Sequence, residues 1–137
     1  MSYKRGVGLT FTEVLVVIVI LSVLIGLALP RFNKARERDL SREAKANLRR
    51  IFEAEKNYRL EMETYYPPTS GIIGSISDIN SNLSLFITGS NWSYEISSTD
   101  GSDFTAYAYR AGSGGYLDCE YFLSNDNEDP TPNSSCP

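Results

Sequence analysis

The hydrophobic residues of this chain gather in one long run near its N-terminal end. From Leu9 to Leu29 nearly every position is apolar, and residues 14–29 contain only Ser22 and Gly26 as breaks. A helix rises about 1.5 Å per residue, so this run spans about 31 Å, the thickness of the hydrocarbon core of a bilayer. The pattern predicts a membrane-spanning helix at residues 9–29.

The helical pattern continues beyond Pro30 with a different character. Apolar side chains recur every three or four positions across residues 31–65, with charged residues on the other faces. No glycine or proline interrupts this stretch before Pro67. We therefore expect one long helix from residue 9 to 65, bent at Pro30. Its second part would pack on a core through Ala44, Leu48, Ile51, Ala54, Tyr58, Met62 and Tyr65.

Shorter patterns follow in the C-terminal half. Residues 67–91 are rich in Ser, Gly and Asn and predict a loop with a few apolar anchors. Residues 124–137 are polar, contain proline and are expected to be irregular. Alternation between two faces predicts strands at 92–98, 104–109 and near 116–123. The predicted fold is α+β, with a small antiparallel sheet packed on the amphipathic half of the helix.

The composition argues against an enzyme. The 137 residues leave room for one small domain and one long accessory element. The chain has no histidine, which excludes imidazole acid–base chemistry and histidine-ligated metals. Its two cysteines cannot form a four-ligand zinc site. We expect a non-enzymatic protein.

The charge is divided between two regions. Residues 31–50 hold eight basic and three acidic side chains, a net charge of +5. Residues 65–137 hold nine acidic side chains and Arg110 as their one basic residue, a net charge of −8. The acidic region would repel phosphate, so we expect no nucleic acid among the partners.

One segment is more specific than these patterns. Lys4-Arg5-Gly6-Val7-Gly8-Leu9-Thr10-Phe11-Thr12-Glu13 leads directly into the apolar helix. It resembles the N-terminal signal of type IV pilins and type II secretion pseudopilins. The resemblance implies that a prepilin peptidase cuts between Gly8 and Leu9 and that the new amine of Leu9 is methylated. The chain departs from the family at Leu9, where phenylalanine is usual.

The resemblance also assigns roles in assembly. A carboxylate costs about 2.5–3.5 kcal/mol at the bilayer centre and less near its edge, so Glu13 is expected to have a cationic partner. In the family that partner is the N-terminal amine of a neighbouring subunit. Pro30 corresponds to the helix-bending proline, and with Gly26 it marks a stretch that can lose helix in the filament.

The resemblance implies four segments and a location. They are a leader (1–8), a membrane and filament-core helix (9–29), its amphipathic continuation (30–66) and a globular head (67–137) with an αβ-loop and a C-terminal disulfide loop. The expected partners are other copies of the chain, minor pilins, the prepilin peptidase, the inner-membrane assembly platform and, before assembly, the lipid bilayer. The leader would be cytoplasmic and the head periplasmic or extracellular. The filament would serve adhesion, motility or uptake.

The C-terminal region carries two further candidates. Cys119 and Cys136 are the only cysteines in a chain expected to be exported, and a bond between them would stabilise the head by about 3 kcal/mol. Type IV pilins carry a similar loop, which favours pilus over pseudopilus. We expect no cofactor, although Asp126, Glu128 and Asp129 offer oxygen ligands and are weak calcium candidates.

Two alternatives remain open. The first is a pseudopilin of a type II secretion system, which shares every N-terminal feature. The second is a soluble secreted domain released by ordinary signal peptidase after Ala28, where small residues fit the cleavage rule. The leader also carries less positive charge than residues 31–50, against the usual charge bias for this orientation. The peptidase motif and the cysteine pair nevertheless favour a cytoplasmic leader.

Overall fold

The computed structural model describes residues 10–112 and 115–137, and for residues 28–31 it describes the backbone alone. The predicted leader, the cleavage position at Gly8 and the mature residue Leu9 therefore lie outside the described residues. Contacts divide the chain into two compact units, Met1–Arg36 and Glu37–Pro137. Each unit is described on its own.

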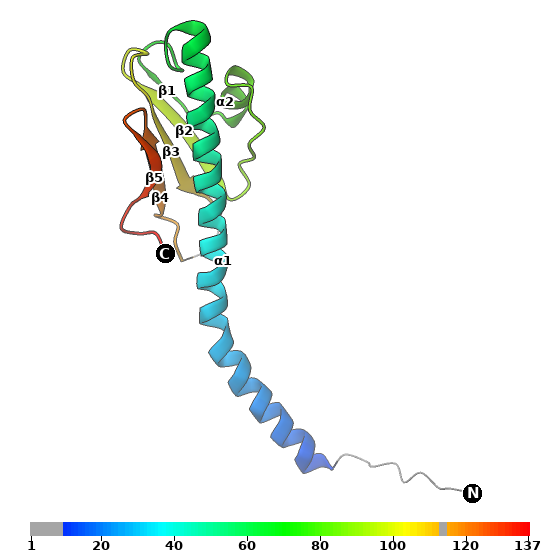
Figure 1. Ribbon diagram of the computed structural model, residues 1–137. Coiled ribbons are helices and arrows are strands. Elements are labelled where there is room, and N and C mark those ends of the chain that lie inside the picture. The colour runs from blue at the N-terminus through cyan, green and yellow to red at the C-terminus, as the bar shows by residue number, and fades with distance from the viewer. Residues whose placement is uncertain (1–9, 113–114) are drawn as a thin grey trace, which may run out of the picture. The chain divides into compact units, whose positions relative to one another are not determined.

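The main helix, α1, spans Phe11–Met62 and contributes to both units (Figure 1). In the first unit the apolar side chains of residues 14–27 are exposed. Among the described residues, α1 is the one helix long and apolar enough to cross a membrane. Its backbone is helical through Pro30.

The helix ends three residues earlier than the sequence predicts. Glu63 adopts a left-handed conformation with φ of 63°, a common way for a helix to stop. Its backbone N–H donates to the carbonyl of Arg59 at 2.9 Å. The prediction that Met62 belongs to the core is also wrong, because this side chain is 59% exposed. Tyr65 is buried as predicted, but from the chain that follows the helix.

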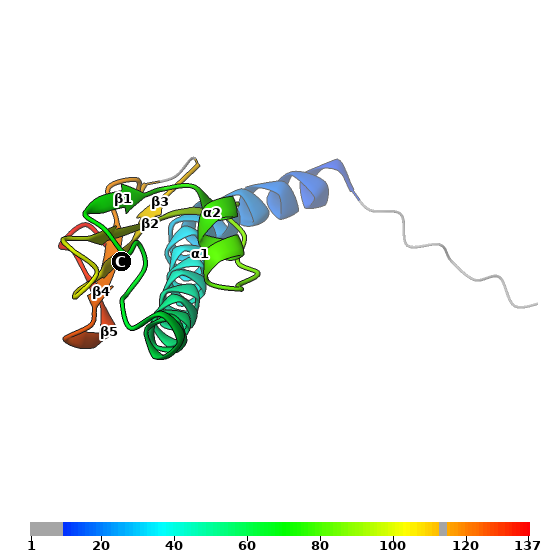
Figure 2. The ribbon, with the colours of Figure 1, turned by 90° about the horizontal axis from the view of Figure 1, so that it is seen from above.

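The second unit contains a five-stranded antiparallel sheet in the order β1-β2-β3-β4-β5. Both helices lie on the same face of this sheet (Figure 2). The α+β, type IV pilin-like layout predicted from the sequence is confirmed. The strands are β1 (Gly71–Ile73), β2 (Trp92–Ser98), β3 (Thr105–Arg110), β4 (Glu120–Ser124) and β5 (Asn127–Pro132).

Two regions predicted to be loops contain regular structure. The segment 67–91 holds β1 and a short helix, α2, at Ile76–Asn82. The helix begins with Ser75, whose hydroxyl accepts the backbone N–H of Asp78 at 3.4 Å. The segment 124–137 was expected to be irregular, and it contains β5. An edge position allows β5 to include Pro130, which a central strand would not tolerate.

The core of the second unit lies between α1 and the inner face of the sheet. Ala44, Leu48 and Ile51 of α1 are fully buried, as their spacing predicts. Phe104 with Ala106 and Ala108 of β3 forms the opposing surface, as the alternation predicts. The second unit begins at Glu37, so the part of α1 from Glu37 to Met62 belongs to the same unit as the sheet.

Candidate assembly site and helix–head anchor

The start of α1 is closed by a reciprocal pair of hydrogen bonds. The hydroxyl of Thr10 accepts the backbone N–H of Glu13 at 3.3 Å, and Oε2 of Glu13 accepts the backbone N–H of Thr10 at 3.5 Å. This is a capping box, which satisfies backbone donors that the first turn of a helix leaves free. The Thr-x-x-Glu spacing of residues 10–13 is the sequence signal for this capping box. Glu13 thus caps the N-terminal end of its own helix. The pairing of its charge with the N-terminal amine of a neighbouring subunit stays a prediction.

The apolar surface after Glu13 has no partner in the described chain. Val19 is 62% exposed and Leu27 is 68% exposed, values that a soluble helix avoids. A side chain at Gly26 would meet no atom within 4 Å, so packing within this chain does not explain the glycine. The predicted loss of helix between Gly26 and Pro30 concerns the filament and stays a prediction. Backbone amide exchange on assembled filaments would test it.

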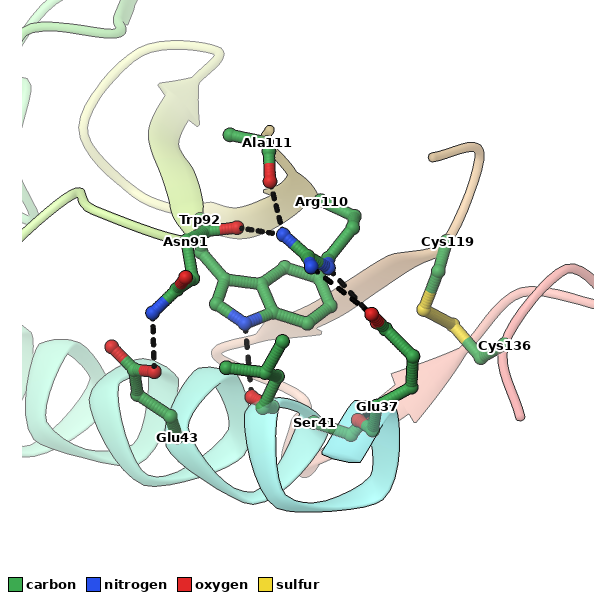
Figure 3. Close-up of polar contacts among 10 residues, drawn as sticks. Glu37, Ser41, Glu43, Asn91, Trp92, Arg110, Ala111, Cys119 and Cys136 are labelled. Carbon is green, nitrogen blue, oxygen red and sulfur yellow. Dashed lines mark hydrogen bonds and ion pairs between the residues drawn. A yellow bond between two sulfur atoms is a disulfide. The ribbon is translucent and has the colours of Figure 1, made fainter. Parts of the chain in front are cut away.

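A buried ion pair joins α1 to the sheet where the second unit begins. The guanidinium of Arg110, at the end of β3, donates to both carboxylate oxygens of Glu37, from Nε at 3.0 Å and from Nη2 at 3.1 Å (Figure 3). The two side chains are only 4% and 10% exposed. The remaining nitrogen of Arg110, Nη1, donates to the backbone carbonyls of Asn91, at 2.9 Å, and of Ala111. All three guanidinium nitrogens are therefore bonded, which a buried cation requires.

An indole ring extends this anchor along the helix. Nε1 of Trp92 donates to the carbonyl of Leu40 at 2.9 Å, and its ring lies 5.8 Å from the guanidinium carbon of Arg110. The amide of Asn91 donates to Glu43 at 3.3 Å (Figure 3). These contacts fix the ends of β2 and β3 on one side of α1. Because Arg110 is the one basic residue of the region 65–137, that isolation was the available sequence signal for a buried pair.

The predicted disulfide between Cys119 and Cys136 is present, with the two Cα atoms 4.6 Å apart. It joins the chain just before β4 to the chain after β5 (Figure 3). The side-chain amide of Asn133 adds a hydrogen bond to the carbonyl of Asp118 at 2.7 Å. The C-terminal segment is thereby held to the sheet by a covalent bond and by polar contacts.

The three calcium candidates do not form a cluster. Asp129 pairs with Arg49 at 3.1 Å, and Glu128 lies 3.9 Å from Lys56, so both carboxylates interact with α1. Asp126 accepts a hydrogen bond from the neighbouring Asn125. Within residues 10–112 and 115–137, no three Cys, Asp or Glu side chains are grouped so that they could hold a metal ion.

A second buried carboxylate lies further along the helix. Glu55 is fully buried, and its Oε2 accepts the backbone N–H of Tyr66 at 2.8 Å. Its other oxygen, Oε1, has no hydrogen-bond partner in the described structure. Burial raises the pKa of this carboxyl group to about 8, and the bond from Tyr66 opposes the shift only in part. Glu55 lies four residues after Ile51 and three before Tyr58, so it shares the core face of α1, and only its charge would have suggested a surface residue.

Comparison with known proteins finds a type IV pilin that is similar to part of this chain. The chain is 34% identical over 61 residues to the type IV major pilin protein PilA of Myxococcus xanthus (strain DK1622). The match covers 44% of this chain and 28% of that relative, so the chain corresponds to less than a third of the relative's length. No family model and no solved structure matches the chain. Over part of its length the chain is therefore similar to a type IV major pilin, and its long apolar N-terminal helix and antiparallel sheet have a type IV pilin-like layout.

Proposed function

We propose that the protein is a prepilin, the structural subunit of a type IV pilus-like helical filament. The observation that carries the proposal is the exposed apolar surface of α1 between Val14 and Leu27, preceded by a single carboxylate at Glu13. A folded head with its own core does not need that surface. Lipid covers it in the precursor, and the helices of other copies cover it in the filament.

The proposed assembly uses Glu13 twice. In the precursor its carboxylate caps its own helix through Thr10. Cleavage between Gly8 and Leu9 creates a cationic amine, and the amine of a neighbouring copy then pairs with the Glu13 carboxylate. Capping by neutral backbone N–H groups leaves the negative charge of Glu13 uncompensated. A cationic partner therefore still lowers the free-energy cost of holding this charge within lipid.

The processing partners follow from the same proposal. A prepilin peptidase removes residues 1–8, and an inner-membrane platform extracts the subunit from the bilayer. The leader faces the cytoplasm, and the head, with its disulfide, faces the oxidising side. A reporter fused after Pro137 should be active only outside the cytoplasm, and activity restricted to the cytoplasm would contradict this orientation.

Glu13→Gln separates the charge of Glu13 from its capping role. Glutamine can complete a capping box, but it cannot neutralise an amine. We expect the variant to be produced and processed, while filaments sheared from the cell surface fall to background. Glu61→Gln, an exposed carboxylate at the end of α1, is the matched control and should leave the filament yield unchanged. Normal filaments from Glu13→Gln would contradict the pairing.

A pseudopilin of a type II secretion system is the second candidate, since it would use the same helix. The Cys119–Cys136 loop favours the pilus by resemblance, because many major pseudopilins lack such a loop. A deletion strain distinguishes the two: loss of surface fibres supports the pilus. Loss of exoprotein secretion with intact fibres supports the pseudopilin.

A further inference from the structure

One face of the sheet points away from both helices (Figure 2). The alternation of buried and less buried positions along β2, β3 and β4 places an aromatic and acidic cluster on that face. It consists of Tyr107 and Tyr109 on β3, Phe122 on β4, and the carboxylates of Glu95 on β2 and Glu120 on β4. These five residues, here called the outer aromatic face, alternate with the buried positions of their strands. They contribute nothing to the core on the inner face.

The strand register places the five side chains next to one another. Tyr107 is paired with Glu95 on one side and with Phe122 on the other, and Tyr109 is paired with Glu120. The rings of Tyr107 and Tyr109 are nearly parallel, with centroids 5.9 Å apart, and that of Phe122 lies 6.4 Å from Tyr107. Residues paired across strands lie close enough for their side chains to interact. Each carboxylate thus flanks a tyrosine ring.

The carboxylates of this face have no side-chain partner among the residues that the structure describes. Across residues 10–112 and 115–137, Glu95 and Glu120 form no ion pair and accept no side-chain hydrogen bond. In contrast, Glu37, Glu128 and Asp129 all pair with cations of this chain. Burial, and then the nearby charges of Glu95 and Glu120, raise the pKa of the Tyr109 hydroxyl.

Two carboxylates beside π faces form a surface for cations. Aromatic rings attract a cation over their faces, and arginine can stack its planar group on a ring while donating hydrogen bonds in its plane. The chain already uses this geometry, because the guanidinium carbon of Arg59 lies 4.6 Å over the ring of Tyr65. The region 65–137 carries a net charge of −8, so its field favours a cationic partner over an anionic one.

We propose that the outer aromatic face binds an arginine-bearing polypeptide segment of a partner protein, with guanidinium groups on the tyrosine rings and hydrogen-bonded to Glu95 and Glu120. The two carboxylates lie on strands separated by β3 and are offset by two residues along it, which places their backbones about 12 Å apart. One guanidinium cannot reach both, so the segment presents two arginines, one to each carboxylate. The assignment does not depend on filament formation.

The test uses the full chain in neutral detergent micelles and a short Gly/Ser peptide that carries two arginines. Calorimetric titration should show binding that weakens with added salt. Glu95→Gln with Glu120→Gln should weaken it about tenfold or more, because charge-assisted hydrogen bonds are lost. The matched control, Glu61→Gln with Asp126→Asn, removes the same charge elsewhere and should bind like the parent chain.

Variants of Tyr107 test separately whether guanidinium groups stack on its ring. Tyr107→Phe keeps the ring and should retain binding, whereas Tyr107→Leu should lose most of it. The near-ultraviolet spectrum and the intact disulfide verify that each variant is folded. No binding to the parent chain, or equal losses in the control and in the Glu95/Glu120 double variant, would overturn the proposal. Equal affinity for the same peptide with lysines would overturn the requirement for guanidinium.

Discussion

At the residue scale, the buried carboxylates of this protein are groups that a hydrophobic pattern does not reveal. Glu37 and Glu55 both lie on α1, and both are buried. Glu37 is matched by Arg110, whereas one oxygen of Glu55 has no partner in the described structure. The two carboxylates should therefore respond to substitution in opposite directions.

Replacing Glu37 with glutamine should strongly destabilise the second unit. The change leaves the Arg110 guanidinium buried with a neutral acceptor, and breaking a buried pair in this way costs about 3–5 kcal/mol. Asp39→Asn, which removes an exposed pair with Arg42 on the same helix, should cost about 0–1 kcal/mol. Chemical denaturation measures both. A loss for Glu37→Gln no larger than for Asp39→Asn would contradict the anchor.

Replacing Glu55 with glutamine should stabilise the protein near neutral pH. The carboxyl keeps its proton in the folded state up to about pH 8, but ionises near its ordinary pKa of 4.5 when unfolded. The folded state binds more protons between these values, so this group lowers the free energy of unfolding as pH rises through that window. The slope is about 1.4 kcal/mol per pH unit, and it levels off above pH 8.

Denaturation curves of the parent chain and of Glu55→Gln, recorded from about pH 5 to about pH 9, test this expectation. The difference in stability should grow with pH in favour of glutamine and then become constant, since glutamine still accepts the Tyr66 N–H. A constant difference across the whole range would mean that Glu55 ionises alike in the folded and unfolded states.

At the scale of elements, the sequence predicted what hydrophobic periodicity controls and failed where single polar residues decide. The long helix, β2 and the inner face of β3 follow from repeating apolar positions. The strand β1 has three residues, too few for a pattern. In β5, the run Asn127-Glu128-Asp129-Pro130 has the composition of a turn, and pairing with β4 at a sheet edge overrides it.

The same distinction applies to the candidate site. The cysteine pair and the Glu13 position were visible in the sequence, and the disulfide is confirmed. Contacts of Arg110 with Glu37 and Trp92 join residues far apart in the chain, and no local pattern encodes them. A lone basic residue in an acidic region was the only sequence signal for that anchor.

Removing the disulfide should loosen the C-terminal strand pair more than the helix. Replacing Cys119 and Cys136 with alanine should cost about 3 kcal/mol through the greater freedom of the unfolded chain. Hydrogen exchange should report faster exchange in β5 and the segment after it, with little change in residues 44–54 of α1. Equal acceleration in both places would show that the bond stabilises the unit only as a whole.

At the scale of the whole molecule, two units of different surface chemistry share one helix. The first exposes an apolar helix, and the second has a buried core and an acidic surface. A soluble protein would not retain the first unit, and a simple membrane anchor would not require Glu13 within it. The proposed polymerisation through that helix would explain both features, and it agrees with the similarity to a type IV major pilin.

The N-terminal sequence and intact mass of the protein from its own cell envelope test this proposal most directly. A pilin-type subunit should begin at Leu9, with or without one added methyl group, and should retain the whole of α1. A chain that begins at Leu29 would instead be a secreted domain released by ordinary signal peptidase. That result would contradict assembly through the apolar helix, because the helix would be absent from the mature protein.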